Sequence, residues 1–418
     1  MGNFYLYILY PMSFLAIYTQ VFFLITYFEN RKKIKYYSPN FDLKTYRTVT
    51  IVVPCFNEEE TIAKTVNSLL SLNYPKHKLK IFLINDGSTD NTLNILKTFE
   101  NKKNIFVFDK KNGGKHTCLN LALENTDSEF FGCLDSDSLV HTEALKRLMG
   151  YFENDEELMA VVPSILVYEP KNMIQYAQQI EYDMAIYIKK MLGFIGGIHV
   201  TPGPFSIFRK KVFDDLGPYR KAHNTEDQEI ALRMQENGYR IDHCHDAYVY
   251  TMTPGTVPKL FRQRIRWIYG FIKNAFDYKR LFFKKEYGNV SWFTLPSGFI
   301  SILGAIVLFF FTIGSIFKYI YDKIIKIQSV GFDSSIGLNF DWFFLNTQIF
   351  LFSSIIIYLL IITAIIFGRN ISNYKNAFSL KIIYFLLIYP FIAPFWLIKS
   401  FYNAFMSKES SWVLERES

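Results

Sequence analysis

Three apolar stretches of the sequence each end in polar or acidic side chains, and this pattern is the first indication of chemistry. The polar ends bear Pro54, Asn57 and Glu58 after the first stretch, Asp86 after the second, and Asp135 and Asp137 after the third. If the stretches are parallel strands, their carboxyl ends meet at one edge of a sheet. The pattern therefore predicts a single crevice lined by carboxylates.

Two aspartates separated by one residue, Asp135 and Asp137, suit a hard divalent cation. Mg²⁺ or Mn²⁺ prefers oxygen ligands and can bridge a diphosphate, neutralising its charge as it leaves. Asp86 could accept hydrogen bonds from a base or a ribose, and Lys115, which follows a glycine turn, suits a phosphate. Each piece alone is also typical of a solvated turn. Their order, each after an expected strand, favours a nucleotide site.

A further pair of acids, Glu226 and Asp227, lies immediately before an amphipathic stretch at residues 228–237. Acids at the first turn of a helix stabilise its dipole, which is one reading of the pair. The other reading makes Asp227 a general base that takes a proton from an acceptor hydroxyl. The two readings are compatible.

A basic and aromatic segment follows, with Gln263, Arg264, Arg266 and Trp267 close together. Such a segment is typical of an interfacial helix anchored by tryptophan. It could also give cations to a leaving diphosphate and an aromatic face to a sugar ring. Taken alone, the segment favours the interfacial helix.

Short apolar runs that alternate with amphipathic stretches predict the elements that position these residues. The expected strands cover residues 48–53, 80–84, 106–109, 130–134 and 158–163. Residues 61–72 are expected to form the helix that follows the first strand, with Val66, Leu69 and Leu70 on one face. The alternation predicts a doubly wound α/β sheet with its ligand at the carboxyl ends of the strands.

Four segments are long and apolar enough to cross a bilayer, for which about 20 residues are needed. They cover residues 4–28, 293–317, 342–367 and 382–405. The basic cluster Arg31–Lys35 predicts that the first segment ends in the cytoplasm. Prolines at 390 and 394 interrupt the last segment, which we expect to kink or to lie partly in the membrane interface.

These patterns predict four parts and a multi-pass protein of the plasma membrane with its catalytic domain in the cytoplasm. The parts are a transmembrane helix over residues 1–30, a cytoplasmic catalytic domain over 45–254, interfacial amphipathic helices over 255–290 and a membrane region of about three spans over 291–418.

The chain carries 46 basic and 38 acidic residues, for a net charge of +8. Many of the basic residues flank apolar spans, so the charge favours a lipid bilayer and not nucleic acid as the partner. The four cysteines include no CxxC pair, and free thiols are expected. His243-Cys244-His245 could hint at a metal, but an incidental polar turn is favoured because no partner cluster lies nearby.

Four elements together resemble a known signature. They are Asp86 in Asn85-Asp86-Gly87-Ser88, Asp135-Ser136-Asp137, Thr225-Glu226-Asp227 and Gln263-Arg264-Ile265-Arg266-Trp267. In this order they resemble the D, DxD, TED and QxxRW motifs of processive family 2 glycosyltransferases, which include cellulose, chitin, hyaluronan and poly-N-acetylglucosamine synthases. The resemblance implies a GT-A type doubly wound sheet domain embedded between transmembrane helices.

The resemblance also implies a role for each residue. Asp86 and Asp135 would contact the uridine, Asp137 would hold Mg²⁺ or Mn²⁺, and Lys115 would lie near the donor, as would Pro54, Asn57 and Glu58. Asp227, beside Glu226, would be the catalytic base. The acceptor and the diphosphate would meet Gly203, Pro204, Gln263, Arg264, Arg266 and Trp267.

The leading hypothesis is an inverting synthase that polymerises a β-linked polysaccharide from a UDP-sugar, UDP-N-acetylglucosamine being preferred, and that exports the growing chain. An accessory membrane subunit is a possible partner. One alternative is a non-processive enzyme that adds one sugar to a polyprenyl phosphate or glycolipid. Another is a non-catalytic membrane partner subunit, which the intact acidic positions disfavour.

Overall fold

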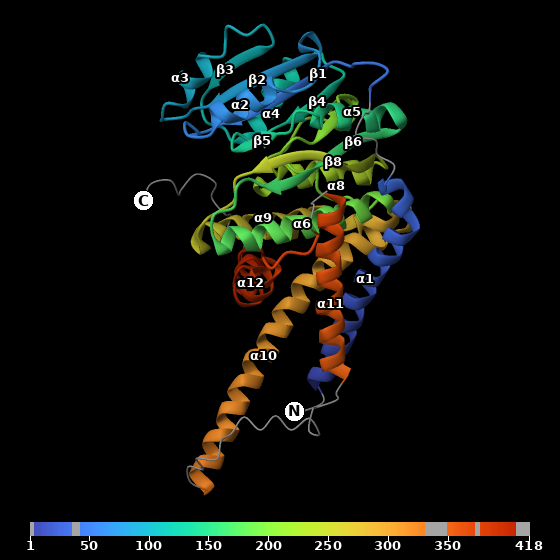
Figure 1. Cartoon of the computed structure of the whole chain (residues 1–418), viewed down its shortest axis with the longest axis vertical. Helices are drawn as coiled ribbons and strands as arrows, with labels where there is room; N and C mark the ends of the chain where they lie inside the picture. Colours follow the sequence, from blue (N-terminus) through green and yellow to red (C-terminus); the bar gives the residue numbers. More distant parts are fainter. Residues whose placement is uncertain (1–3, 36–41, 331–348, 373–376, 407–418) are drawn as a thin grey trace.

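The computed structural model describes residues 4–35, 42–330, 349–372 and 377–406. An α/β domain lies at one end of the molecule, and long helices extend from its underside (Figure 1). The mixed sheet of this domain has eight strands in the order β3-β2-β1-β4-β7-β6-β8-β5.

Four parallel strands form the first half of the sheet and confirm the expected α/β order. They are β1 (Val49–Cys55), β2 (Leu79–Asp86), β3 (Ile105–Lys110) and β4 (Phe130–Cys133). The connecting helices are α2 (Ile62–Leu70), α3 (Thr92–Lys97) and α4 (Lys115–Glu124). The strand ends that bear the acids therefore lie at one edge, as the sequence predicts.

The second half of the sheet mixes strand directions. Its strands are β5 (Ser138–Val140), β6 (Leu158–Val167), β7 (Ile207–Arg209) and β8 (Arg240–Thr251). The short β7 runs antiparallel between β4 and β6, and β8 pairs parallel with β6 and antiparallel with β5. The helices of this half are α5 (Ala144–Asn154), α6 (Met173–Phe194), α7 (Lys211–Leu216) and α8 (Glu226–Glu236).

Two hydrophobic cores cover the two faces of the sheet. In β1, Ile51 and Val53 belong to the core that includes Val66 and Leu69 of α2, whereas Val52 faces the core of α4 and α6. All three β1 residues are fully buried. Burial on both faces explains why β1 is continuously apolar.

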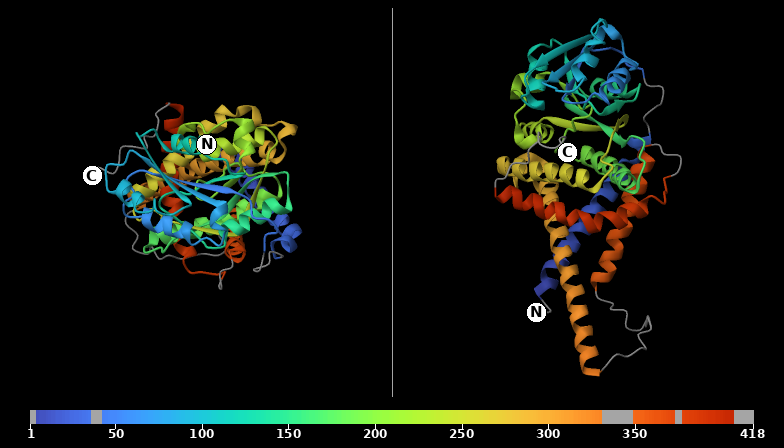
Figure 2. Two further views of the ribbon diagram at one scale, coloured as in Figure 1. Left: turned by 90° about the horizontal axis from the view of Figure 1, so that it is seen from above. Right: turned by 90° about the vertical axis from the view of Figure 1, so that its left-hand side faces the viewer.

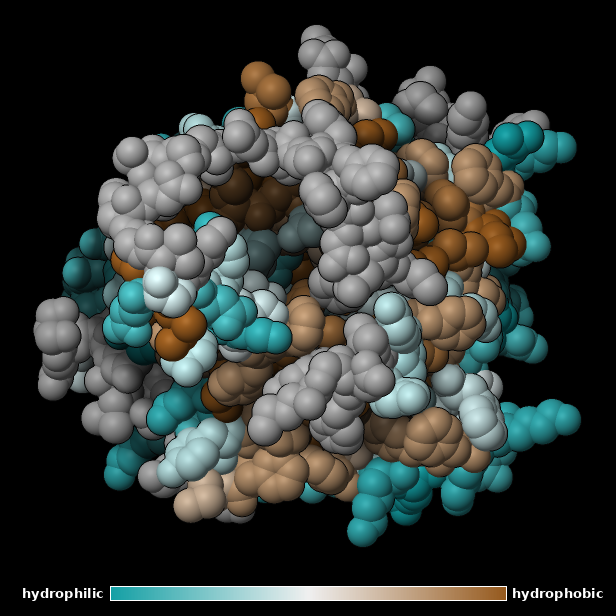
Figure 3. Space-filling view, turned by 90° about the horizontal axis from the view of Figure 1, so that it is seen from below, coloured by the Kyte–Doolittle hydropathy of each residue, from teal (hydrophilic) through white to brown (hydrophobic). Residues whose placement is uncertain are grey.

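Beneath the domain, α9 (Val257–Asp277) lies alongside α6, and the long apolar helices begin or end nearby (Figure 1). These helices are α1 (Phe4–Lys35), α10 (Leu295–Val330), α11 (Ile349–Ile371) and α12 (Ile382–Phe405). Within the described residues, all four are long and apolar enough to cross a membrane. Residues 342–348 of the expected segment 342–367 lie outside the described part. Seen from below, hydrophobic residues cover much of this end of the molecule (Figure 3).

The direction of α12 differs from that of the other three apolar helices. Helices α1, α10 and α11 extend along the long axis, whereas α12 is seen nearly end-on in Figure 1. A quarter turn of the view shows α12 running across the molecule beneath the domain (Figure 2). It packs there against α9 and α6.

The segment His243-Cys244-His245 is not a turn, so this expectation was wrong. It lies inside β8, where all three side chains are buried. The described residues contain no group of three His, Cys, Asp or Glu side chains arranged to hold a metal. All four cysteines are free and buried, as expected.

Candidate active site

The loops after β1 and β2 are tied to each other by short polar contacts. The backbone N–H of Asn57 donates to Ser88 Oγ at 3.0 Å, and Asn57 Oδ1 accepts from the Thr89 N–H at 2.8 Å. Asn57 adopts a left-handed backbone conformation, with φ 54°. Glu58 follows, and its N–H donates to Thr92 Oγ1 at 2.8 Å. Pro54, near the end of β1, lies opposite Ile84 of β2, so all three predicted residues lie at the carboxyl end of β1 or in the loop after it.

Asp86, the last residue of β2, has both carboxylate oxygens engaged. It accepts hydrogen bonds from the N–H groups of Gly113 and Gly114 at 3.0 and 2.8 Å, and it lies 2.5 Å from Lys110 Nζ. Its side chain is almost completely buried. A carboxylate that accepts backbone N–H groups fixes the path of the loop. Asp86 thus shapes the glycine turn that precedes Lys115.

Asp137 lies in a crowded, negatively charged environment. Burial, together with the neighbouring carboxylates of Asp135 and Glu58, raises its pKa to about 7. Its Oδ1 accepts a hydrogen bond from the hydroxyl of Ser138, at 3.2 Å. Such a carboxylate suits a cation that takes few protein ligands and shares a substrate diphosphate, as Mg²⁺ and Mn²⁺ do. The residues present therefore fit the predicted divalent cation.

Lys115 begins α4 and connects two parts of the site. Its Nζ lies 2.6 Å from Asp135 Oδ1 and 3.3 Å from Glu226 Oε1. Burial alone would lower the pKa of this ammonium, but the carboxylates Asp135 and Glu226 hold it well above its usual range. Lys115 is therefore a fixed positive charge between the DxD loop and α8.

The loop that contains Gly203 and Pro204 covers this ion pair. A Cβ at Gly203 would lie 2.4 Å from Lys115 Nζ and 3.0 Å from the Asp135 carboxylate, so the backbone of this loop lies close to the ion pair. A small cavity lies against the same loop. Its lining includes Lys115, Thr201, Gly203, Tyr219, Glu226 and Asp227.

Glu226 and Asp227 occupy the first turn of α8, which begins two residues before the predicted helix. Burial raises the pKa of Asp227 to about 6, and Glu226 adds to this effect, while Lys115 and Arg266 oppose it. The backbone carbonyl of Asp227 accepts hydrogen bonds from the Thr201 N–H at 3.1 Å and from its hydroxyl at 2.7 Å. The raised pKa and the fixed backbone suit a general base.

The predicted residues of α9 separate into two groups. Arg266 faces α8, and its Nη1 donates to the Asn224 carbonyl at 3.3 Å. Arg264 turns to the other side, where it lies 2.6 Å from Glu181 Oε2 and 4.4 Å from the ring centre of Trp267. Gln263 carries a buried Oε1 with no hydrogen-bond partner in the described part of the chain.

Residues 50–217 match the protein family Glycosyl transferase family 2, so this part of the chain resembles a family 2 glycosyltransferase domain. The match spans the strand ends with Asp86, Asp135 and Asp137 and stops before α8.

Curated relatives of this chain include poly-beta-1,6-N-acetyl-D-glucosamine synthases. That of Staphylococcus aureus (strain COL) is 31% identical over 273 residues, which cover 64% of this chain and 65% of the relative. That of Staphylococcus epidermidis is 31% identical over 224 residues, covering 53% of this chain and 54% of the relative. The chain therefore spans somewhat less than two thirds of the length of these relatives.

The similarity to one solved structure extends beyond residues 50–217. The mannosyltransferase PcManGT from Pyrobaculum calidifontis, solved in complex with GDP-Man and Mn²⁺, aligns with a TM-score of 0.59 and 16% identity. The alignment covers 95% of this chain and 100% of that chain. It confirms the GT-A type α/β fold predicted from the sequence.

Several residues near the candidate site were not predicted from the sequence. Glu181 of α6 and Tyr389 of α12 complete the surroundings of Arg264, since the Tyr389 hydroxyl donates to Glu181 Oε2 at 2.5 Å. Burial lowers the pKa of Lys189 on α6 to about 8. The nearby carboxylate of Asp227 acts in the opposite direction, with a smaller effect. These residues lie on long helices without a motif of their own, so no local signal marks them.

Proposed function

We propose that this protein is a membrane-bound inverting glycosyltransferase that polymerises a β-linked polysaccharide from UDP-N-acetylglucosamine. The observation that carries the proposal is the position of Asp227. It lies at the first turn of α8, lines the same cavity as Lys115 and is influenced electrostatically by Arg266 of α9. The proposed base Asp227, the donor-side cation Lys115 and the helix with the QxxRW motif therefore lie around one site. The names of the staphylococcal relatives support the choice of sugar.

In the proposed reaction, Asp227 takes the proton of an acceptor hydroxyl. The oxygen then forms a bond to the anomeric carbon of the donor from the face opposite the diphosphate. The bond between that carbon and the diphosphate oxygen breaks, its electron pair stays with the leaving UDP, and the anomeric configuration inverts. A base with a pKa near 6 can accept this proton at neutral pH.

The donor would lie along the strand ends, with its uridine near Asp86 and Asp135. Asp137 would hold Mg²⁺ or Mn²⁺, which would neutralise charge on the diphosphate when bound. Lys115 would add a second cation on the donor side. Pro54, Asn57 and Glu58 would border the nucleotide, and Glu226 would keep Lys115 oriented through their 3.3 Å contact.

The acceptor would approach between the Gly203-Pro204 loop and α9. Trp267 would offer a ring face to the acceptor sugar, and Gln263 has an unsatisfied buried oxygen that a sugar hydroxyl could satisfy. Arg266 would face the leaving diphosphate. Because its guanidinium is bound to Glu181 and stacked on Trp267, Arg264 would act by holding Trp267 in place.

We further propose that α1, α10 and α11 cross the bilayer while α12 lies along its cytoplasmic surface. The support is the direction of α12, which runs across the other three helices and beneath α9 and α6 (Figure 2). With three crossings, the catalytic domain and α12 lie on the same, cytoplasmic side. We also propose that the polymer is exported across the membrane and that an accessory membrane subunit takes part.

The decisive experiment incubates the purified full-length protein with labelled UDP-sugars and either Mn²⁺ or Mg²⁺. We expect UDP release with UDP-N-acetylglucosamine and a product of many sugars on a gel. A product extended by a single sugar would refute polymerisation, and UDP release only with another donor would refute the choice of sugar. The Asp227→Asn variant should lose transfer while it still binds UDP. Normal elongation by that variant would refute the assignment of the base.

A further inference from the structure

A strained turn precedes the helix that carries Asp227. Three consecutive residues, Ala222, His223 and Asn224, have left-handed backbone angles, with φ of 45°, 56° and 62°. None of them is glycine, and residues with side chains rarely adopt this conformation because it is strained. A turn of this kind persists only where its surroundings hold it in place. The contacts around the turn therefore indicate what holds it.

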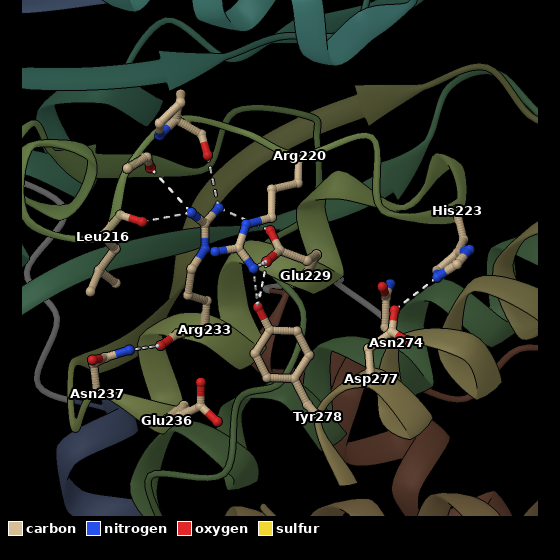
Figure 4. Close-up of polar contacts among 12 residues, drawn as sticks. Leu216, Arg220, His223, Glu229, Arg233, Glu236, Asn237, Asn274, Asp277 and Tyr278 are labelled. Carbon is tan, nitrogen blue, oxygen red and sulfur yellow. Dashed lines mark hydrogen bonds and ion pairs between the residues drawn. The ribbon is translucent and has the colours of Figure 1, made fainter. Parts of the chain in front are cut away.

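Helix α9 contacts the last two residues of the turn, His223 and Asn224, and the residue that follows it, Thr225. The His223 ring lies 2.8 Å from Asp277, and the Asn224 carbonyl accepts from Arg266. Asn274, itself almost fully buried, donates from Nδ2 to Thr225 Oγ1 at 2.8 Å. Figure 4 shows His223 pointing toward Asp277 beside Asn274.

Gly270 lets α9 come close enough to make these contacts. A Cβ at Gly270 would lie 2.2 Å from Thr225 Oγ1 and 2.8 Å from Thr225 Cβ. Such an approach is possible only without a side chain, because real Cβ contacts are not that short. The backbone of α9 thus packs directly against the threonine of the Thr225-Glu226-Asp227 motif.

Thr225 connects this contact to α8, the helix that carries Asp227. Its carbonyl accepts hydrogen bonds from the N–H groups of Gln228 and Glu229 at 3.1 Å each, which begin α8. Farther along α8, the buried carboxylate of Glu229 accepts from the hydroxyl of Tyr278, which follows α9 directly (Figure 4). The same carboxylate lies 2.9 Å from Arg233 and 3.4 Å from Arg220. Two separate contacts therefore join the two helices.

We propose that Asn274 and Gly270 are positioning residues for the catalytic base, and that α9 holds the strained turn so that α8 presents Asp227 to the acceptor. This inference rests on the proposed function, because it takes Asp227 to be the base. In this proposal, α9 both contacts the acceptor and positions the base. A shift of about 1 Å in a reacting group can reduce a rate by about a hundredfold, so a loosened turn matters.

The test uses two variants of the full-length protein, each with a matched control. Asn274→Leu removes the hydrogen bond at nearly constant volume, and Lys273→Leu changes the neighbouring residue of the same helix. Gly270→Ala adds a methyl group against Thr225, and Gly314→Ala adds one on α10 where nothing lies within 4 Å. Steady-state UDP release, thermal melting and hydrogen exchange by mass spectrometry are measured for all four.

We expect both test variants to lose about tenfold or more in kcat with the KM for the donor nearly unchanged. Exchange of the amides at residues 222–229 should rise while that of β1 and β2 stays the same, and both controls should resemble the wild type. Wild-type kcat with unchanged exchange at 222–229 would overturn the proposal. A joint loss of melting temperature, UDP affinity and protection in β1 and β2 would also overturn it, since the role would be merely structural.

The exchange measurement separates this inference from the proposed function. If the wild type releases no UDP from any donor, the proposed function fails, but exchange at residues 222–229 still reports whether α9 holds the turn. Unchanged exchange in Asn274→Leu and Gly270→Ala would then overturn the inference by itself.

Discussion

The ammonium group of Lys115 lies 3.3 Å from the carboxylate of Glu226, which links the glycine turn after β3 to the first turn of α8. The same ammonium is 2.6 Å from Asp135. One cation therefore balances acids from two parts of the chain that are far apart in sequence. In the proposed function, these two parts are the donor side and the base side of one site.

Replacing Lys115 should weaken donor binding. In Lys115→Met, two partly buried carboxylates lose their cation, and the donor loses a charge-assisted contact worth about 1.5–3 kcal/mol. We expect affinity for UDP-N-acetylglucosamine to fall about tenfold to a hundredfold, measured by calorimetry. Lys111→Met, an exposed lysine of the same loop, is the control. Equal affinities of the two variants would contradict this role of Lys115.

The pH dependence of turnover should report Asp227. A base must be deprotonated to act, and the pKa of Asp227 is raised to about 6 by burial and by Glu226. We therefore expect kcat to rise with pH through about 6 and to level off above it, with a slope of about tenfold per pH unit on the acid side. The measurement is kcat from pH 5 to 8 at saturating donor. A flat profile across this range would exclude Asp227 as the group that titrates in turnover.

Divalent cations should bind at Asp137 and stabilise the protein. The carboxylate is crowded by Asp135 and Glu58, so a cation would relieve repulsion among them. With UDP present, we expect Mn²⁺ to raise the melting temperature of the wild type, because a ligand at about 100 times its Kd stabilises by about 2.7 kcal/mol.

In the same assay, Asp137→Asn should show little response to Mn²⁺ and should not transfer sugar. Chelation should abolish wild-type activity, and added Mn²⁺ or Mg²⁺ should restore it. The surface variant Asp127→Asn, whose side chain is 82% exposed, serves as the control. If Asp137→Asn responds to Mn²⁺ as the control does, the cation lies elsewhere.

Chemical labelling should reveal the side of the membrane on which α12 lies. The four native cysteines are buried, so introduced cysteines can be read against a low background. We expect Lys399→Cys on α12 to be labelled from the same side as Glu59→Cys in the catalytic domain. Lys323→Cys, near the far end of α10, should be labelled from the opposite side. Labelling of Lys399→Cys together with Lys323→Cys would mean that α12 crosses the bilayer.

The sequence by itself determined the parallel half of the sheet and the position of the acids on it. Asp86, Asp135 and Asp137 follow apolar runs, and the carboxyl ends of parallel strands always meet at one edge, so a local pattern fixes a shared location. The long apolar helices are likewise a matter of length and composition. For both features, the relevant physics acts within about twenty neighbouring residues.

Only the tertiary structure decided which side chains from different elements meet. The contacts of Arg264 with Glu181, and of Asn274 with Thr225, join helices whose relative orientation no local pattern encodes. The direction of α12 is also a tertiary property, because an apolar helix of this length can cross a bilayer or lie on its surface. Packing against α6 and α9 sets the direction of α12 in this structure. The chemical groups of the site can therefore be read from the sequence, whereas the contacts that hold them in place depend on how the helices pack.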